Sequence, residues 1–192
     1  MQKMWIAGIL ASVAAAGSGA QKRPPDIVVF VHADSAGASA FGAAEGRAAK
    51  MLAAAGVSVA WRLGKPNYRG PAEVIEAVLT TRTDESFRPG ALAYATIGPQ
   101  SGIRIVIFYD RILDKGIGSR VPPILAHVLV HEITHILEGV ERHSAYGVMK
   151  ATWEGGDWMR MSFSGLPFAD EDLQLIHLWS ARHNRNLVAG LH

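Results

Sequence analysis

Cysteine is absent from all 192 residues of this sequence, so neither a disulfide framework nor a lipid-modified cysteine can anchor or stabilise the protein. Long runs of one charge are missing too. The densest basic stretch is Gln21–Arg23 and the formal net charge is +2, which argues against nucleic acid as a partner. The composition, 49% hydrophobic and 19% charged, is that of a globular chain long enough for one domain with a hydrophobic core.

The first twenty residues differ from the rest of the chain. Lys3 precedes an apolar run from Met4 to Ala16, and small residues follow as far as Ala20. The run is too short to cross a bilayer comfortably, since about 20 residues are needed. A charged start, a short apolar run and a small-residue cleavage site are typical of a signal peptide. We predict that residues 1–20 are removed and that residues 21–192 form a single domain, secreted or periplasmic, with no stable membrane anchor. A short anchor or a buried terminal helix is the alternative.

Strand and helix signals alternate along the remaining chain. An apolar, β-branched run at 26–32, an alanine-rich helix at 38–55 and a strand at 57–62 predict a parallel strand–helix–strand unit. The apolar pattern predicts three further strands and two helices, with an irregular stretch between the helices. These strands are expected at 78–82, at 91–97 on a sheet edge and at 103–109, and the helices at 122–138 and 170–183. The sequence therefore predicts an α/β (α+β) fold.

The chemistry of the chain is concentrated in His131-Glu132-Ile133-Thr134-His135, inside the predicted helix. Histidines four residues apart lie on one helix face, one turn above the other, so both imidazoles can bind the same zinc ion. Glu132 is rotated by about 100° from His131 and need not be a ligand. It can instead accept a proton from water at the metal. The pattern predicts His131 and His135 as metal ligands and Glu132 as general base.

A catalytic zinc needs a third protein ligand and one open position. His143 lies eight residues after His135, beyond Gly139, a residue that can end the helix in a left-handed conformation and turn the chain back. Glu154 is the rival third ligand, although the sequence around it does not resemble a helix. His127, one turn before His131, is expected to be a satisfied or supporting histidine, and Glu138 a solvated charge at the helix end.

The segment from His131 to Met149 resembles the metzincin metallopeptidases, in which a third histidine follows a helix-ending glycine and a Met-turn lies under the metal. His143-Ser144, Val148-Met149 and the acidic start of the last helix, 168–173, resemble matrix metalloproteinases in particular. The spacing differs, because the loop from His135 to His143 is two residues longer than in the family consensus. The resemblance implies a zincin-like fold: a five-stranded, mixed, twisted sheet with one antiparallel edge strand, then a zinc-binding helix, the Met-turn and a C-terminal helix.

The resemblance also implies a function. It predicts that residues 21–192 form a metallopeptidase catalytic domain with one catalytic zinc ion held by His131, His135 and His143, and with Met149 in the Met-turn. The expected activity is hydrolysis of peptide bonds in peptide or protein substrates by a zinc-activated water. A zinc hydrolase acting on another amide, such as a cell-wall peptide, and a non-catalytic secreted zinc-binding module are the alternatives.

Overall fold

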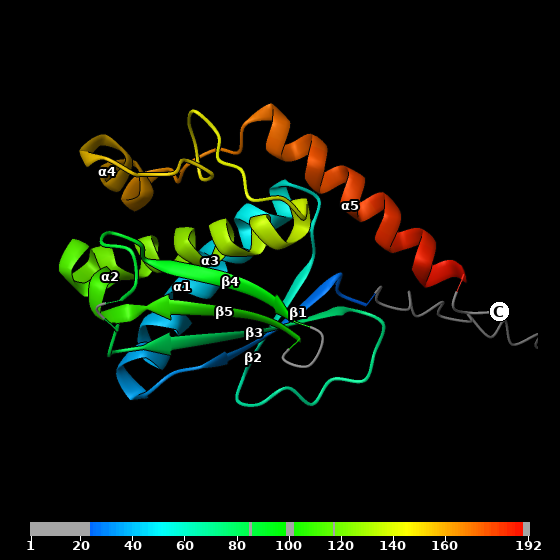
Figure 1. The fold of residues 1–192 in the computed structure, drawn as a ribbon, viewed down its shortest axis with the longest axis horizontal. Helices are drawn as coiled ribbons and strands as arrows, with labels where there is room; N and C mark the ends of the chain where they lie inside the picture. The colour runs from blue at the N-terminus through cyan, green and yellow to red at the C-terminus, as the bar shows by residue number, and fades with distance from the viewer. Residues whose placement is uncertain (1–23, 85, 99–101, 117, 190–192) are drawn as a thin grey trace, which may run out of the picture.

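The computed structural model describes residues 24–84, 86–98, 102–116 and 118–189, so the predicted signal peptide lies outside the described residues. Within these described residues, five strands and five α-helices follow one another (Figure 1). The strands are β1 (Ile27–His32), β2 (Val59–Leu63), β3 (Glu73–Thr80), β4 (Ala93–Gly98) and β5 (Gly102–Phe108). The helices are α1 (Ser35–Ala54), α2 (Tyr109–Lys115), α3 (Val121–Glu138), α4 (Gly155–Phe163) and α5 (Asp170–Ala189), with a 3₁₀ turn η1 (Gly118–Arg120) before α3.

The strands form one mixed sheet in the order β2-β1-β3-β5-β4. All neighbours pair in parallel except β4 and β5, which are antiparallel, with Ala93 opposite Ile107. This confirms the predicted parallel unit at the start of the chain and the predicted edge position of the fourth strand. The antiparallel edge strand expected from the resemblance is therefore present.

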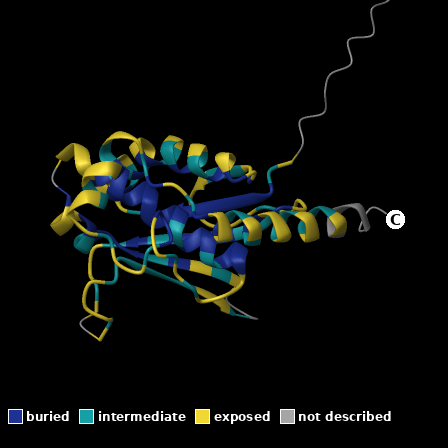
Figure 2. Cartoon of the chain, turned by 90° about the horizontal axis from the view of Figure 1, so that it is seen from above, coloured by how far each residue is buried: buried dark blue, intermediate teal, exposed yellow. Residues whose placement is uncertain are grey.

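Strand alternation divides the core into two unequal parts. Every second side chain of β1, β3 and β5 packs under α1 and α3 in the main core. The opposite side of β1 contributes Val28 and Phe30 to a small cluster with Ala72 and the partly buried Tyr68, from the loop that leads into β3. Figure 2 shows the buried residues gathered in the interior, with exposed residues on the outer helices and loops. No helix in the described ranges has both the length and the apolarity that crossing a bilayer requires.

Helix α1 begins at a cap. Asp34 accepts a hydrogen bond from the backbone N–H of Gly37 at 2.8 Å, which starts the helix three residues before the predicted 38. A buried face of Phe41, Ala44, Ala48 and Leu52 packs into the main core. Small alanine side chains on this face let α1 approach α3 closely, and the two helices lie together on one side of the sheet (Figure 1).

Other elements also differ from the sequence-based expectations. Strand β3 covers Glu73–Thr80, so it begins five residues before the predicted 78 and ends two residues before the predicted 82. Tyr109 begins helix α2 instead of ending a strand. The stretch predicted to be irregular contains α4, and α5 extends to Ala189 instead of ending near 183. In α4 a reciprocal capping box between Glu154 and Asp157 compensates for the weak helix propensity of two glycines.

Candidate metal centre

Helix α3 presents two of the predicted ligands on one face. Its first turn contains two prolines, which are tolerated there because N–H groups in the first turn have no partner within the helix. Gly139 ends the helix in the left-handed region at φ 68°. The backbone N–H of Gly139 donates to the carbonyl of His135 at 3.0 Å, so the helix ends one turn after that ligand. The chain then turns back toward the same face and brings His143 to it.

His131, His135 and His143 come together at this point. One ring nitrogen from each lies within 4.8 Å of the others, close enough for all three to bind a single metal ion. The ring centroid of His143 is 5.4 Å from that of His131 and 5.0 Å from that of His135. The Nε2 atoms of His131 and His135 are 3.1 Å apart. The two-residue insertion relative to the metzincin spacing therefore does not prevent His143 from joining the group.

The orientation of His131 suits a metal ligand. Its Nδ1 is 2.8 Å from the carbonyl oxygen of Val148. Because a carbonyl oxygen only accepts, the proton of the neutral ring sits on Nδ1, and Nε2 is left with its lone pair directed at His135. Two nitrogens facing each other at 3.1 Å with a third nearby form a donor set that fits a divalent transition metal.

The three imidazoles are held in the neutral form that binds metals. Burial lowers the pKa of His131 to about 4, reinforced by the neighbouring His135 and His143. Burial also lowers the pKa of His135, and the pKa of His143 is lowered by burial and then by the charges of Arg88 and Arg142. Few protons therefore need to leave the site when a metal enters at neutral pH.

The segment that the resemblance predicts as the Met-turn contacts both His131 and the loop that carries His143. Gly147 has a φ of 83°, and a Cβ there would meet the carbonyl oxygen of Pro167 at 2.2 Å, so only glycine fits. The next residue, Val148, supplies the carbonyl that orients His131 and donates its own N–H to Pro167 at 2.8 Å. Met149 is fully buried, and its carbonyl accepts a hydrogen bond from the backbone N–H of Ser144 at 2.8 Å. The turn thus connects the position of His131 to that of the loop carrying His143.

His143 is fixed through the residues on either side of it. Arg142 donates to a carboxylate oxygen of Asp172 at 2.8 Å and to Glu138 at 3.1 Å, and the hydroxyl of Ser144 donates to Asp172 at 2.5 Å. We call these four residues the Arg142 cluster. The side chains of Glu138 and Asp172 are fully buried, so Glu138 is not the solvated charge that the sequence predicted. Because Asp172 belongs to α5, the cluster ties the third candidate ligand to the last helix.

Glu132 lies next to the ligands as a buried, unpartnered carboxylate. It is 7% exposed, and the described residues give it neither a hydrogen bond nor an ion pair. Burial raises its pKa to about 7. A carboxylate that is largely withdrawn from water and has no protein partner favours a role in chemistry over a purely structural one. A pKa near neutrality lets the group both accept and return a proton.

Glu154, the rival third ligand, takes another role. It caps α4, and its side chain is 79% exposed, with Lys150 at 3.9 Å as an ion-pair partner. It does not belong to the group of three histidines. Of the two candidates the geometry therefore favours His143.

Comparison with models of protein families finds no match to this chain, and a search of curated proteins finds no relative. The case for a function accordingly depends on the site itself.

Trp153 forms a wall of the centre. Its ring stands at 79° to that of His131 with the centroids 5.4 Å apart, and the ring centroid of a second tryptophan, Trp158, lies 5.7 Å from that of Trp153.

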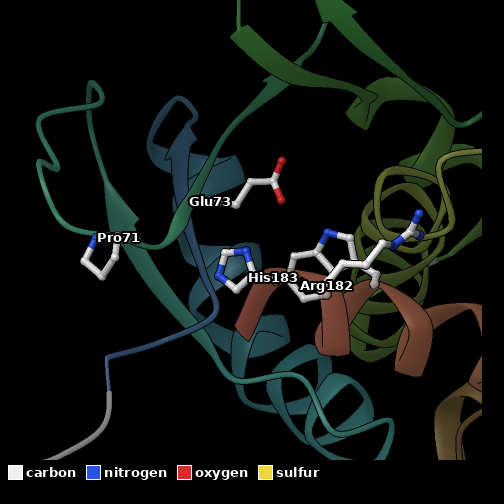
Figure 3. Close-up of a pocket in the computed structure, with 5 residues that line it drawn as sticks. Pro71, Glu73, Arg182 and His183 are labelled. Carbon is white, nitrogen blue, oxygen red and sulfur yellow. The ribbon is translucent and has the colours of Figure 1, made fainter. Parts of the chain in front are cut away.

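A separate cavity of about 370 Å³ is formed where the start of β3 meets α5, and its lining includes Glu73 and the stacked rings of Trp179 and His183 (Figure 3). That cavity contains none of the three histidines of the metal centre.

His127 is a structural histidine. It is fully buried, its Nδ1–H donates to the carbonyl of Pro123 at 2.7 Å, and its Nε2 accepts the backbone N–H of Leu166 at 3.0 Å. Both ring nitrogens are in use, so neither is free for a metal. His127 thus joins α3 to the segment that leads into α5, which confirms the prediction that both of its ring nitrogens are hydrogen-bonded.

Acid should destabilise the metal-free protein partly through His127. Burial lowers the pKa of His127 to about 4, whereas the unfolded chain has a value near 6.5. As pH falls below 6.5 the unfolded state binds the proton first, so the free energy of unfolding decreases down to pH 4, by about 3 kcal/mol. Urea unfolding at several pH values measures this. H127Q retains an acceptor for Leu166 and should show a shallower pH dependence; equal slopes in both proteins would contradict the assignment.

Proposed function

We propose that this protein is a zinc-dependent endopeptidase of metzincin type, with zinc held by His131, His135 and His143. One observation carries the proposal: three imidazole nitrogens lie within 4.8 Å of one another, and Glu132, the residue that follows the first of these histidines, is buried without a hydrogen bond or ion pair in the described chain. A structural zinc site is usually closed by four ligands and needs no base, whereas a catalytic one has three and an open position. The set of residues corresponds to the second kind.

His131, His135 and His143 would hold the zinc ion, which would lower the pKa of a bound water toward about 7 and make a substrate carbonyl more electrophilic. The part of the reaction that the protein's own side chains carry out is the proton transfer. Glu132 accepts the proton of the attacking water and delivers it to the departing amine, so that the carboxylate ends the cycle as it began. Its pKa of about 7 in the metal-free protein is consistent with both tasks.

Substrate binding is assigned to strand β4. It is the last strand of the sheet, it contacts α3, and its outer edge has no strand partner among the described residues. An extended peptide that pairs with this edge gains backbone hydrogen bonds without a demand on its sequence. The peptide would then run beside the helix that carries His131 and His135. We also propose export of the protein through its predicted signal peptide.

The protein purified with zinc should cleave denatured casein. A strong chelator should abolish the cleavage, because it competes with the three imidazoles for the zinc ion and removes it. Readdition of one equivalent of zinc should restore the rate. Fragment formation followed by electrophoresis and mass spectrometry measures the activity. Tight binding of one zinc ion with no cleavage of casein or of peptide libraries would instead assign the chain to a zinc-binding module.

A further inference from the structure

A second cavity, of about 470 Å³, lies between α4 and the segment that leads into α3. Its apolar lining comes from α4 and includes Trp158, Met159 and Phe163, while Lys115 and Arg120 line it from the other side. Met159 and Phe163 are 65% and 81% exposed, unusually high values for large apolar side chains on neighbouring turns of one helix. The cavity thus combines an aromatic and aliphatic wall with two cations.

The cavity is next to the metal centre. Trp153 packs against His131 with ring centroids 5.4 Å apart, and Trp158 packs against Trp153 at 5.7 Å. Because Trp158 itself lines the cavity, the cavity is connected to a candidate ligand through the contacts of two tryptophan rings. A substrate residue two or three positions from a bond held at the metal can place its side chain at the cavity, since successive residues of an extended chain are about 3.4 Å apart.

The charge of the cavity is uncompensated. Lys115 and Arg120 are exposed, and neither forms an ion pair with any residue of the described ranges. No acidic side chain is among the lining residues. The two cations are consequently available to a ligand, and the apolar wall opposite them favours a ligand whose negative group is carried on a hydrocarbon stem.

We propose that this cavity determines the specificity of the enzyme by binding a carboxylate of the substrate, with Lys115 and Arg120 contacting the carboxylate and Trp158, Met159 and Phe163 contacting its methylene groups. This inference rests on the proposed peptidase function. The carboxylate can belong to a glutamate or aspartate side chain near the scissile bond or to the C-terminus of a peptide. Both sources have the same chemistry, and substrate design separates them.

Fluorogenic peptides that differ at one position provide the test. Glu, Gln and Lys are placed in turn at each position around the cleaved bond, with the C-terminus either free or amidated. At one position kcat/KM for Glu should exceed that for Gln by about tenfold, as expected for a charge-assisted contact. For a side-chain carboxylate this preference survives amidation, whereas for a terminal carboxylate the rates for Glu and Gln are equal and amidation lowers kcat/KM by about tenfold. Equal rates for Glu, Gln and Lys at every position, with free and amidated termini alike, would overturn the proposal while leaving the peptidase function intact.

Charge reversal provides the matched variants. Lys115→Glu combined with Arg120→Glu should reverse the preference, so that the Lys peptide becomes the better substrate by about tenfold and the Gln peptide changes little. A gain for the Lys peptide cannot result from misfolding. Lys50→Glu combined with Arg69→Glu changes the net charge equally at exposed positions that line neither cavity and should retain the original preference. The same shift in both variants would show a general charge effect and contradict the assignment.

A binding measurement separates the two proposals. Titration of the metal-free protein with amidated Glu and Gln peptides, followed by tryptophan fluorescence, should give a Kd about tenfold lower for the Glu peptide, and the K115E/R120E protein should lose the difference. If no peptide is cleaved but this preference is found, the peptidase function fails and the cavity remains a carboxylate site. If peptides are cleaved and no preference appears in either assay, only the cavity proposal fails.

Discussion

Glu132→Gln is expected to abolish peptide cleavage while zinc remains bound. Glutamine has nearly the same size and fits the same buried position, yet it cannot accept a proton from water. Loss of a general base lowers kcat by about 10²–10⁴-fold. The two quantities to measure are kcat on a fluorogenic peptide and the zinc content of the dialysed protein by elemental analysis.

Glu141→Gln is the matched control, because Glu141 is exposed on the loop that carries His143. It should retain both zinc and activity. Turnover by E132Q at a rate similar to wild type would refute the role of Glu132. A loss of zinc together with activity would show that this carboxylate supports the metal instead of the proton transfer.

Removal of the third imidazole should affect the metal itself. His143→Ala leaves only His131 and His135 as ligands. Zinc affinity is expected to fall on the order of 10²–10³-fold, because one of three ligands no longer contributes to the binding free energy. Competition with a chromophoric chelator measures the affinity directly. Cleavage should disappear at zinc concentrations that saturate the wild type.

Glu154→Ala tests the rival ligand under the same conditions. Its side chain is 79% exposed at the cap of α4, so its removal should leave zinc affinity unchanged and cost only helix-cap stability, about 1 kcal/mol. The opposite pattern, with affinity retained in H143A and lost in E154A, would transfer the third ligand position to Glu154.

The sequence predicted those features that depend on local pattern. Spacing placed His131 and His135 on one helix face, and Gly139 marked the end of that helix, as the left-handed φ of 68° confirms. The order of strands along the chain and the edge position of β4 also followed from local apolar patterns. Each of these needs only interactions between residues a few positions apart.

The features that could not be predicted from the sequence depend on residues distant in the chain or on helix capping. Two consecutive glycines suggested a loop at the start of α4, because the capping box that overrides their low propensity is a side-chain geometry. The burial of Glu138 depends on Arg142 and on Asp172, 34 residues further along the chain, so its surroundings could not be inferred from the helix end alone. Trp158 lines the same cavity as Lys115 and Arg120, which lie about forty residues earlier in the chain, and no local pattern predicts this proximity.

The Arg142 cluster has a consequence for the order of events during synthesis. Asp172, which fixes both neighbours of His143, leaves the ribosome about forty residues after His131. A nascent chain that ends before this aspartate keeps the backbone hydrogen bond from Ser144 to Met149 and the contact of Arg142 with Glu138, but it lacks the carboxylate that Arg142 and Ser144 share. We therefore expect the loop that carries His143 to be held less firmly until the final helix docks. If the three histidines bind a metal as proposed, the site reaches its full affinity only after the last helix of the chain has been made.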